Sequence, residues 1–225
     1  MKRSILIPAF LLIATFFSSA QGIYTTTSGE IIFQSSSVEQ NNTDINSNMR
    51  FTLFFHLGEY IHFDLSNNIG LFSGLGIRNV GLITEENDIK IKYRTYNLGI
   101  PLAIKLGAFD KNLYLFGGAE YEWMFAFKQK VFENDEKTKY VEWFSDRTPH
   151  FIPSVFAGIQ FPYGLQVRFR YYLDNYLNNN YKGSSTYSDY TSFNKTQVWY
   201  ISFSYVIRNR NVKQSQFIEK DVAKL

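Results

Sequence analysis

The chain has 225 residues, of which 45% are hydrophobic and 18% aromatic, and it contains no cysteine. The lack of cysteine excludes a disulfide scaffold, a thiol nucleophile, a zinc–thiolate site and a lipid anchor attached to cysteine. The 23 basic residues nearly balance the 20 acidic ones, for a formal charge of +3. No basic stripe is visible along the sequence, so we expect no nucleic-acid partner. The apolar content is also too high for a disordered chain.

Residues 1–20 have the pattern of a secretory signal peptide. Lys2 and Arg3 precede an apolar run at 5–17, and small residues lead up to Ala20. The apolar run is shorter than the roughly 20 residues that a membrane-spanning helix needs. We therefore predict export of the chain and cleavage after Ala20.

Beyond residue 28 the sequence alternates with period two, which is typical of β-strands with one apolar face. In the clearest stretch, 98–106, every second residue is Leu or Ile. Short turn signals, such as those at 66–68, 110–112 and 162–164, alternate with longer polar stretches. The predicted strands lie at 29–38, 49–65, 69–84, 89–107, 113–132, 150–161, 165–177 and 195–207.

An even number of antiparallel strands, with short turns at one end and long loops at the other, is typical of an outer-membrane β-barrel. We therefore predict an all-β protein, a transmembrane antiparallel up-and-down β-barrel of eight strands in the cell outer membrane. The dipeptide Gly58-Glu59 fits either a bulge or a turn, so a count of ten strands stays open. The predicted organisation is a signal peptide at 1–20, an N-terminal segment at 21–28, the barrel at 29–207 and a periplasmic C-terminal tail at 208–225.

The cost of placing charges in lipid decides which face of the strands points outward. With the aliphatic face outward, five charged side chains point into the lumen: Lys105, Glu120, Glu122, Arg168 and Arg170. The opposite register would place all five in hydrocarbon, at up to roughly 2–4 kcal/mol for each Lys or Arg at mid-depth. We therefore predict a filled lumen in which these side chains form an ion-pair network, because buried charges need partners. The alternative is that they lie in water near the barrel mouths.

The segment 96–105, with the sequence YNLGIPLAIK, resembles the Y-x-L-x-I-P-L-x-x-K strand of PorT-like outer-membrane β-barrel proteins of Bacteroidota, which are of OmpA/OmpX size. Segments 74–79 and 164–172 also resemble strands of that group, and 143–149 resembles a loop of one subgroup. The resemblance covers roughly 29–207 and implies the fold and the compartment. It also implies one alternative function, that of an accessory subunit in a type IX-like secretion machine.

Catalysis has little support in the sequence, and we predict no enzymatic activity, no cofactor and no metal site. Barrel enzymes need a histidine beside a serine or acidic partners at the outer rim. His62 and Asp64 share a strand face near the periplasmic end, where a structural pair explains them better. His150 has Asp146 and Ser154 nearby in the sequence and is the better of the two candidates.

Several predicted strands run well past the nine or so residues that span lipid, and the excess lies on the long-loop side. There the outward positions Lys90, Lys92 and Arg94 are polar, so we expect the barrel to project above the membrane. Aromatic residues among adaptable polar ones are typical of binding loops. The candidate partner-binding residues are Trp143, Phe144, Arg147, Tyr181, Tyr187 and Tyr190.

These features predict a non-enzymatic barrel with a filled lumen. The barrel is surrounded by outer-membrane lipid and is structural, or binds other outer-membrane or periplasmic proteins through its extracellular loops. A small solute channel is the remaining alternative, although eight strands leave an interior that side chains fill.

Overall fold

The computed structural model describes residues 22–212 except 87, 135 and 184–185. The predicted signal peptide and residues 213–225 of the predicted tail lie outside the described residues. The strands are β1 (Gly22–Gln40), β2 (Thr43–Ile45), β3 (Arg50–Thr52), β4 (Leu57–Asp64), β5 (Ile69–Glu86), β6 (Ile89–Ala108), β7 (Leu113–Glu133), β8 (Glu136–Trp143), β9 (Phe151–Gln160), β10 (Leu165–Tyr172) and β11 (Phe193–Val212). Two 3₁₀ turns are η1 (Pro162–Gly164) and η2 (Thr186–Ser188).

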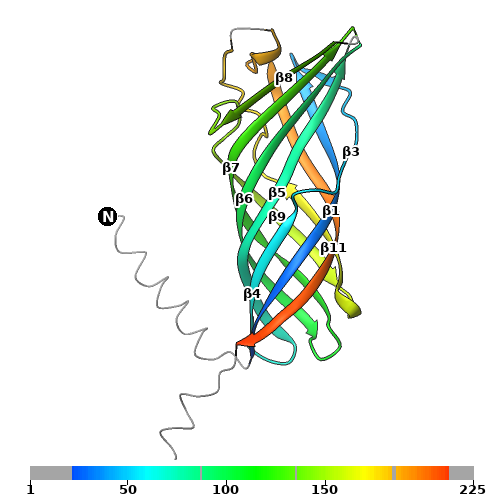
Figure 1. Cartoon of the computed structure of the whole chain (residues 1–225), viewed down its shortest axis with the longest axis vertical. Helices are drawn as coiled ribbons and strands as arrows, with labels where there is room; N and C mark the ends of the chain where they lie inside the picture. Colours follow the sequence, from blue (N-terminus) through cyan, green and yellow to red (C-terminus); the bar gives the residue numbers. More distant parts are fainter. Residues whose placement is uncertain (1–21, 87, 135, 184–185, 213–225) are drawn as a thin grey trace, which may run out of the picture.

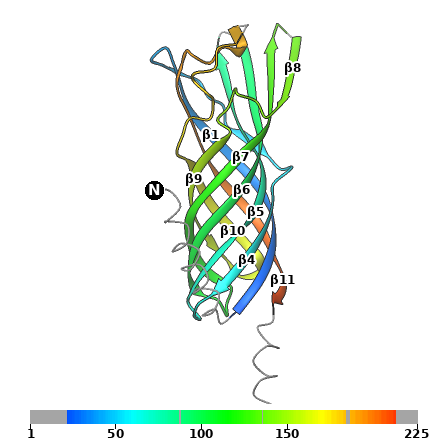
Figure 2. The ribbon, with the colours of Figure 1, turned by 90° about the vertical axis from the view of Figure 1, so that its left-hand side faces the viewer.

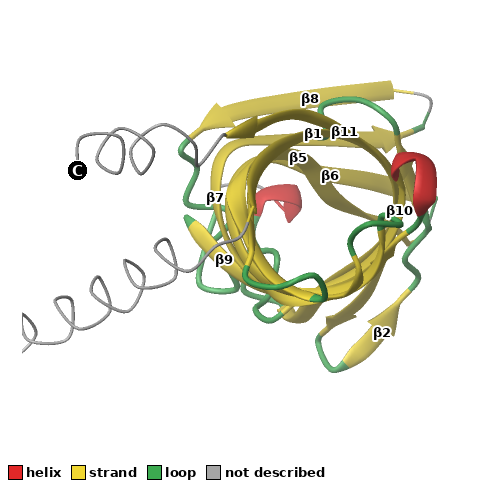
Figure 3. Cartoon of the chain, turned by 90° about the horizontal axis from the view of Figure 1, so that it is seen from below, coloured by secondary structure: helices red, strands yellow, loops and turns green. Residues whose placement is uncertain are grey.

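The strands form an antiparallel up-and-down barrel (Figure 1). Hydrogen-bonded neighbours follow the order β1-β4-β5-β6-β7-β9-β10-β11, and β11 pairs with β1 to close the ring (Figure 3). Strand β3 shares its wall position with β4 because both pair with β1, whereas β8 pairs with β7 outside the ring. The wall therefore has eight positions, which confirms the predicted fold and count and excludes ten strands. None of the described segments is a helix of the length and apolarity that crossing a membrane requires.

The barrel starts earlier and ends later than the alternation indicates. Strand β1 begins at Gly22, and its ladder with β11 runs from the pair Ile23–Val212 to the pair Gln40–Phe193. The predicted segment 21–28 is therefore largely barrel wall, and residues 208–212 of the predicted tail are strand. The prediction was wrong at these ends because ladder hydrogen bonds satisfy the backbone there without an apolar pattern in the side chains.

The second wall position is interrupted, but not at Gly58-Glu59. The break falls between β3 and β4, at residues 53–56, where Phe55 has a φ of +66°. A bulky residue in the left-handed region cannot continue a strand, so the ladder stops and restarts at Leu57. The peptide N–H of Glu30 in β1 donates to the carbonyl of His56 at 3.1 Å, which bridges the gap.

Two strands lie in stretches that the sequence pattern indicates as loops. Strand β2 lies in the predicted loop 39–48, and β8 lies in the predicted loop 133–149. The β7–β8 hairpin extends beyond the ring at the long-loop end (Figure 2). Because this hairpin stands outside the apolar part of the barrel, β8 needs no apolar face and shows no apolar alternation.

The outer surface of the ring is apolar over the height of the shorter strands. We call this surface the apolar belt. Its members include Leu75, Ile77, Ile100, Leu102, Ile104, Leu115, Phe169 and Phe203, all of which are exposed. Toward the long-loop end the belt gives way to stacked ring pairs, Tyr121–Phe151, Trp123–Phe144 and Phe125–Trp143, whose centroids lie 5.4–6.0 Å apart. We call these six residues the aromatic girdle.

Candidate functional site

The interior of the barrel is closed at mid-height by a network of buried charges. Arg170 contacts both Glu120, at 2.5 Å, and Glu122, at 2.9 Å. Arg78 also contacts both carboxylates and reaches Glu30 at 3.7 Å. Arg168 is joined to the same Glu30 at 3.3 Å. We call these six side chains, Glu30, Arg78, Glu120, Glu122, Arg168 and Arg170, the lumen network. Three cations and three anions balance there, and each side chain is at most 2% exposed.

The sequence interpretation covers this network in part. The structure brings Glu120, Glu122 and Arg170 together, and Arg168 is linked to them through Glu30. Lys105 does not belong to the network, because it pairs with Asp64 and its ammonium group donates a hydrogen bond to the Tyr24 hydroxyl, at 2.8 Å, nearer the short-turn end. Sequence reasoning missed two members, Arg78 and Glu30. Strand β1, which carries Glu30, lacks a clear apolar alternation. Glu30 nevertheless points inward, because it pairs with the buried Ser204 of β11.

A second closure lies above the network, where the loop between β10 and β11 folds into the barrel. The Tyr176 hydroxyl donates to the carbonyl of Val80 at 3.1 Å, and the Tyr190 hydroxyl donates to the Gln129 side chain at 3.0 Å. Both rings are fully buried. The prediction that Tyr190 is an exposed binding residue is therefore wrong, because its ring packs against Tyr93 in the barrel interior.

Arg147 joins this loop to the β7–β8 hairpin. Its guanidinium lies 4.1 Å from the centre of the Tyr140 ring and 5.1 Å from that of Tyr181. The carboxylate of Glu142 lies 3.5 Å from the same group. Arg147 is 8% exposed, and Tyr181 packs against Tyr190. Both were predicted to bind a partner, but their side chains mainly hold the β10–β11 loop in place.

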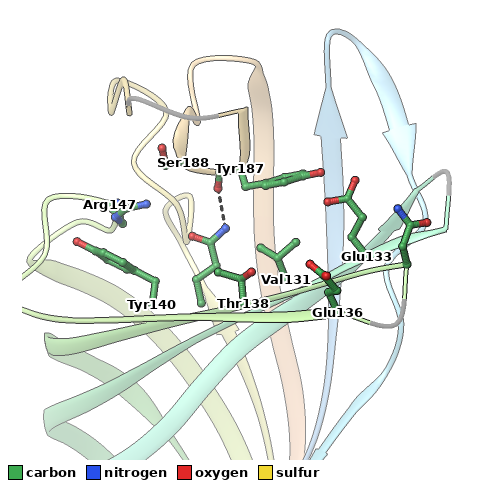
Figure 4. A pocket seen from close by; sticks show the side chains of 10 residues that line it. Val131, Glu133, Glu136, Thr138, Tyr140, Arg147, Tyr187 and Ser188 are labelled. Atoms are coloured by element: carbon green, nitrogen blue, oxygen red, sulfur yellow. Dashed lines mark hydrogen bonds between the residues drawn. The ribbon is translucent and has the colours of Figure 1, made fainter.

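A pocket opens between the inner face of the β7–β8 hairpin and the β10–β11 loop (Figure 4). Its cavity volume is about 540 Å³, and its lining residues are Gln129, Val131, Glu133, Asn134, Glu136, Thr138, Tyr140, Arg147, Tyr187 and Ser188. The Tyr187 ring extends across the pocket toward Glu133, and a hydrogen bond with that carboxylate raises the pKa of the tyrosine hydroxyl. The carbonyl of Tyr187 accepts a hydrogen bond from the Gln129 amide at 2.6 Å. The pocket thus combines carboxylates, amides and two tyrosine rings.

Trp143 and Phe144 lie on another surface. They are 64% and 57% exposed, but they stack on Phe125 and Trp123 in the aromatic girdle of the outer wall. Of the six predicted partner-binding residues, the structure therefore places only Arg147 and Tyr187 at the pocket.

The histidines that the sequence singled out have structural partners. The His62 ring bonds to Thr26 at 2.9 Å and stacks on Tyr24, whereas Asp64 pairs with Lys105. His150 lies 3.4 Å from Asp146 on the exposed rim. Ser154 is buried in the lumen, where Arg170 donates to its hydroxyl at 2.8 Å, so it does not complete a triad with His150. Across 22–212, leaving aside the gaps, no group of three or more His, Asp and Glu residues forms a metal site.

Comparisons with known proteins give weak likenesses. No protein-family model matches the sequence, and a search of curated proteins finds no match. Among solved structures, Ail, the attachment invasion locus protein of Yersinia pestis, is 10% identical, with 82% of this chain and 99% of that chain covered and a TM-score of 0.40. Neisserial surface protein A is 8% identical, with 84% and 100% covered and a TM-score of 0.45. The outer membrane protein OprG from Pseudomonas aeruginosa is 12% identical, with 84% and 98% covered and a TM-score of 0.37. Likenesses of this degree carry no argument about function. The functional proposal below therefore rests on the geometry of the barrel.

Proposed function

We propose that this chain is an integral outer-membrane β-barrel with a closed lumen and no enzymatic activity, whose extracellular end binds a partner. The closure of the lumen at two heights, combined with an apolar outer surface, is the observation that carries the proposal. An apolar belt that continues around a monomer exceeds the exposed patches that soluble proteins tolerate. Its alternating positions on β6 run from Leu98 to Leu106, which matches the roughly 9–11 residues of a tilted transmembrane strand.

The charged interior explains why the barrel is a poor channel. An eight-stranded barrel is just wide enough for its own side chains. Here the large side chains of Arg78, Arg168 and Arg170 cross the lumen, and their carboxylate partners hold them there. A solute would have to break ion pairs that have no access to water, so passage is unfavourable.

The length of three strands supports a role outside the membrane. Strands β5, β6 and β7 have 18, 20 and 21 residues, about twice the length that spans lipid. The excess of β7 lines the pocket beneath Tyr187 and pairs with β8 in the hairpin. An extension of this kind is not needed to cross the membrane, so a contact with a partner outside it is the simplest use.

The membrane location is tested by fractionation. We expect the mature chain in the outer-membrane fraction, extracted only by detergent, with faster migration in gels before boiling than after. Recovery of a folded, soluble protein without detergent would contradict the proposal and favour a barrel that binds small ligands in water.

The closed lumen is tested by planar-bilayer recording of the purified full chain, with a general porin as the positive control. We expect no stable conductance steps above those of the bilayer alone. Reproducible steps on the nanosiemens scale would reject the closed lumen and favour the solute channel.

The alternative role as an accessory subunit of a type IX-like secretion machine rests on the PorT-like strand sequence. Purification in mild detergent separates it from a barrel that works alone. A lone barrel elutes without stoichiometric partners, whereas a subunit retains them. If a retained partner uses the pocket, Tyr187→Ala combined with Glu136→Ala releases it, and the exposed control Lys111→Ala does not.

A further inference from the structure

The outward face of the β6–β7–β8 extension is strongly cationic. Cross-strand pairing places nine side chains on this face in a grid of three rows. The rows are Arg94, Lys128 and Val141; Lys92, Lys130 and Lys139; and Lys90, Phe132 and Lys137. We call this surface the basic face. Seven of its nine positions are Lys or Arg, and no acidic residue interrupts it.

A bulge in β7 creates the face. The ladder between β6 and β7 shifts register between Tyr96 and Asn97, so Phe125 is an extra residue in β7. Below the bulge Trp123 lies outward, opposite Leu98, and above it Ala126 lies outward, opposite Tyr96. The bulge therefore moves the even-numbered residues of β7, which point inward lower down, to the outer surface.

Six of the seven cations of this face have no ion pair among the described residues. Lys92, Lys130 and Lys139 lie directly opposite one another on adjacent strands, an arrangement that destabilises a sheet. In the part of the chain that the structure describes, Lys90 has an ion pair, with Glu85 at 2.8 Å, and the other six cations have none. Partial burial and then the neighbouring cations lower the pKa of Lys92, and the same causes lower that of Lys130.

The acidic residues of the hairpin lie on its other face. Glu133 and Glu136 line the pocket, and Glu142 pairs with Arg147. On the basic face the ring of Phe132 lies under the ammonium groups of Lys92, at 4.9 Å, and Lys137, at 5.9 Å, and holds them toward the exterior. The separation of charge across the sheet leaves a concentrated positive surface that an anion would stabilise.

The position of the face relative to the aromatic girdle indicates the source of that anion. Arg94 follows Tyr96 at the next outward position, and the row with Lys128 starts directly above Phe125 and Trp143. With a rise of about 3.3 Å per residue and a tilt of about 40°, successive rows lie roughly 5 Å apart in height. The headgroup layer on one side of a bilayer is about 5–8 Å deep. The first row therefore lies at the depth of lipid phosphates, and the upper two rows lie just above it.

We propose that the basic face binds the phosphate groups of a phosphorylated glycolipid in the surrounding outer leaflet. The inference rests on the membrane location proposed above. The face looks sideways, over the lipids that surround the apolar belt, and not upward toward the solution. A glycolipid with a sugar headgroup is tall enough to reach the upper rows, which a simple phospholipid is not. Its acyl chains lie against the belt while its phosphates meet the lysines.

The test compares three probes on the purified full chain in detergent micelles, with bound molecules counted by native mass spectrometry. The probes are diphosphorylated lipid A, the same lipid with its phosphates removed, and inositol hexakisphosphate as a soluble polyanion. We expect the phosphorylated lipid to bind at least tenfold more tightly than the other two. Neutralising the middle row, in Lys92→Gln/Lys130→Gln/Lys139→Gln, should weaken its binding by roughly one to two orders of magnitude.

Matched variants separate this site from general charge. Lys111→Gln/Lys182→Gln/Lys195→Gln changes the net charge equally at exposed lysines elsewhere and should bind as the wild type does. Replacing the middle row by arginine should preserve binding. Heat-modifiable migration in gels checks that every variant folds as a barrel. A failure of the membrane proposal is therefore distinguished from a failure of lipid binding. Unchanged lipid binding by the neutralised row, or an equal loss in the matched control, overturns the inference. Equal affinity for inositol hexakisphosphate overturns the lipid source and assigns the face to soluble polyanions.

Discussion

Removing Arg170 tests whether the lumen network holds the barrel together. The substitution Arg170→Met keeps most of the side-chain volume but takes away the contacts with Glu120 and Glu122 and the hydrogen bond to Ser154. Arg78 is then the one network cation that reaches both carboxylates. Breaking a buried ion pair from one side costs about 3–5 kcal/mol, because the remaining charge stays desolvated.

The free energy of unfolding is measured by urea titration of the barrel refolded in lipid vesicles, with tryptophan fluorescence as the signal. A loss of about 3–5 kcal/mol corresponds to a midpoint lower by roughly 1–5 M urea, for slopes of about 1–3 kcal/mol per molar. Arg94→Met is the matched control, because it removes an arginine from the exposed basic face. There we expect a change within about 0.5 kcal/mol.

A charge-balanced variant decides between lost pairing and lost packing. Arg170→Met combined with Glu122→Gln leaves two cations and two anions in the lumen network, so much of the stability should return. A loss below about 1 kcal/mol for the single variant would show that water reaches the network. Failure of the double variant to recover would show that the arginine acts through packing, and either result refutes the reasoning.

Three further changes have graded outcomes. A Cβ at Gly118 would meet the backbone of the neighbouring strand, whereas a Cβ at Gly29 would meet nothing within 4 Å. The substitution Gly118→Ala should therefore lower the fraction of heat-modifiable protein after refolding, and Gly29→Ala should leave that fraction unchanged. Tyr176→Phe loses the buried hydrogen bonds of the hydroxyl and should cost about 1 kcal/mol in the same urea titration, with the ring still in place. Lys105→Met should cost less than Arg170→Met, because its partner Asp64 keeps 17% of its side chain exposed and stays partly hydrated; an equal loss would contradict this ranking.

The half of the barrel that carries the apolar belt could be predicted from the sequence because one rule applies to every strand there. Hydrocarbon outside and a packed lumen inside force alternation, so the stretch 98–106 alone indicates a strand and its register. The short turns at 66–68 and 162–164 follow from local turn chemistry. The end of β1 near Gly22 and the position of Glu30 were not accessible, since they depend on pairing with β11, far away in the sequence.

The long-loop half of the barrel could not be predicted in the same way, because an outer surface without an apolar belt imposes no alternation on the strands. Strand β8 reads as a polar loop, and nothing local shows that it pairs with β7. A strict period of two from Glu122 would place Lys128 and Lys130 in the lumen. The bulge at Phe125 reverses that parity, and a single extra residue in one strand is invisible without its partner. The basic face thus exists only at the level of the sheet, and for this reason the sequence shows no basic stripe.

The two faces of the β7–β8 hairpin link the proposed lipid site to the proposed binding pocket. Within the described residues β8 pairs with β7 alone, so one edge of the hairpin has no strand beside it. Repulsion between Lys130 and Lys139 acts across that single ladder and weakens it, and lipid phosphates on the basic face would remove the repulsion. Because Tyr140 and Thr138 line the pocket on the opposite face of the same strand, a more firmly held hairpin also gives a more firmly shaped pocket. Binding of a partner in the pocket should therefore be stronger in membranes that contain the phosphorylated glycolipid than in those that lack it. The neutralised middle row should abolish that dependence, since without repulsion across the ladder the lipid has nothing to relieve.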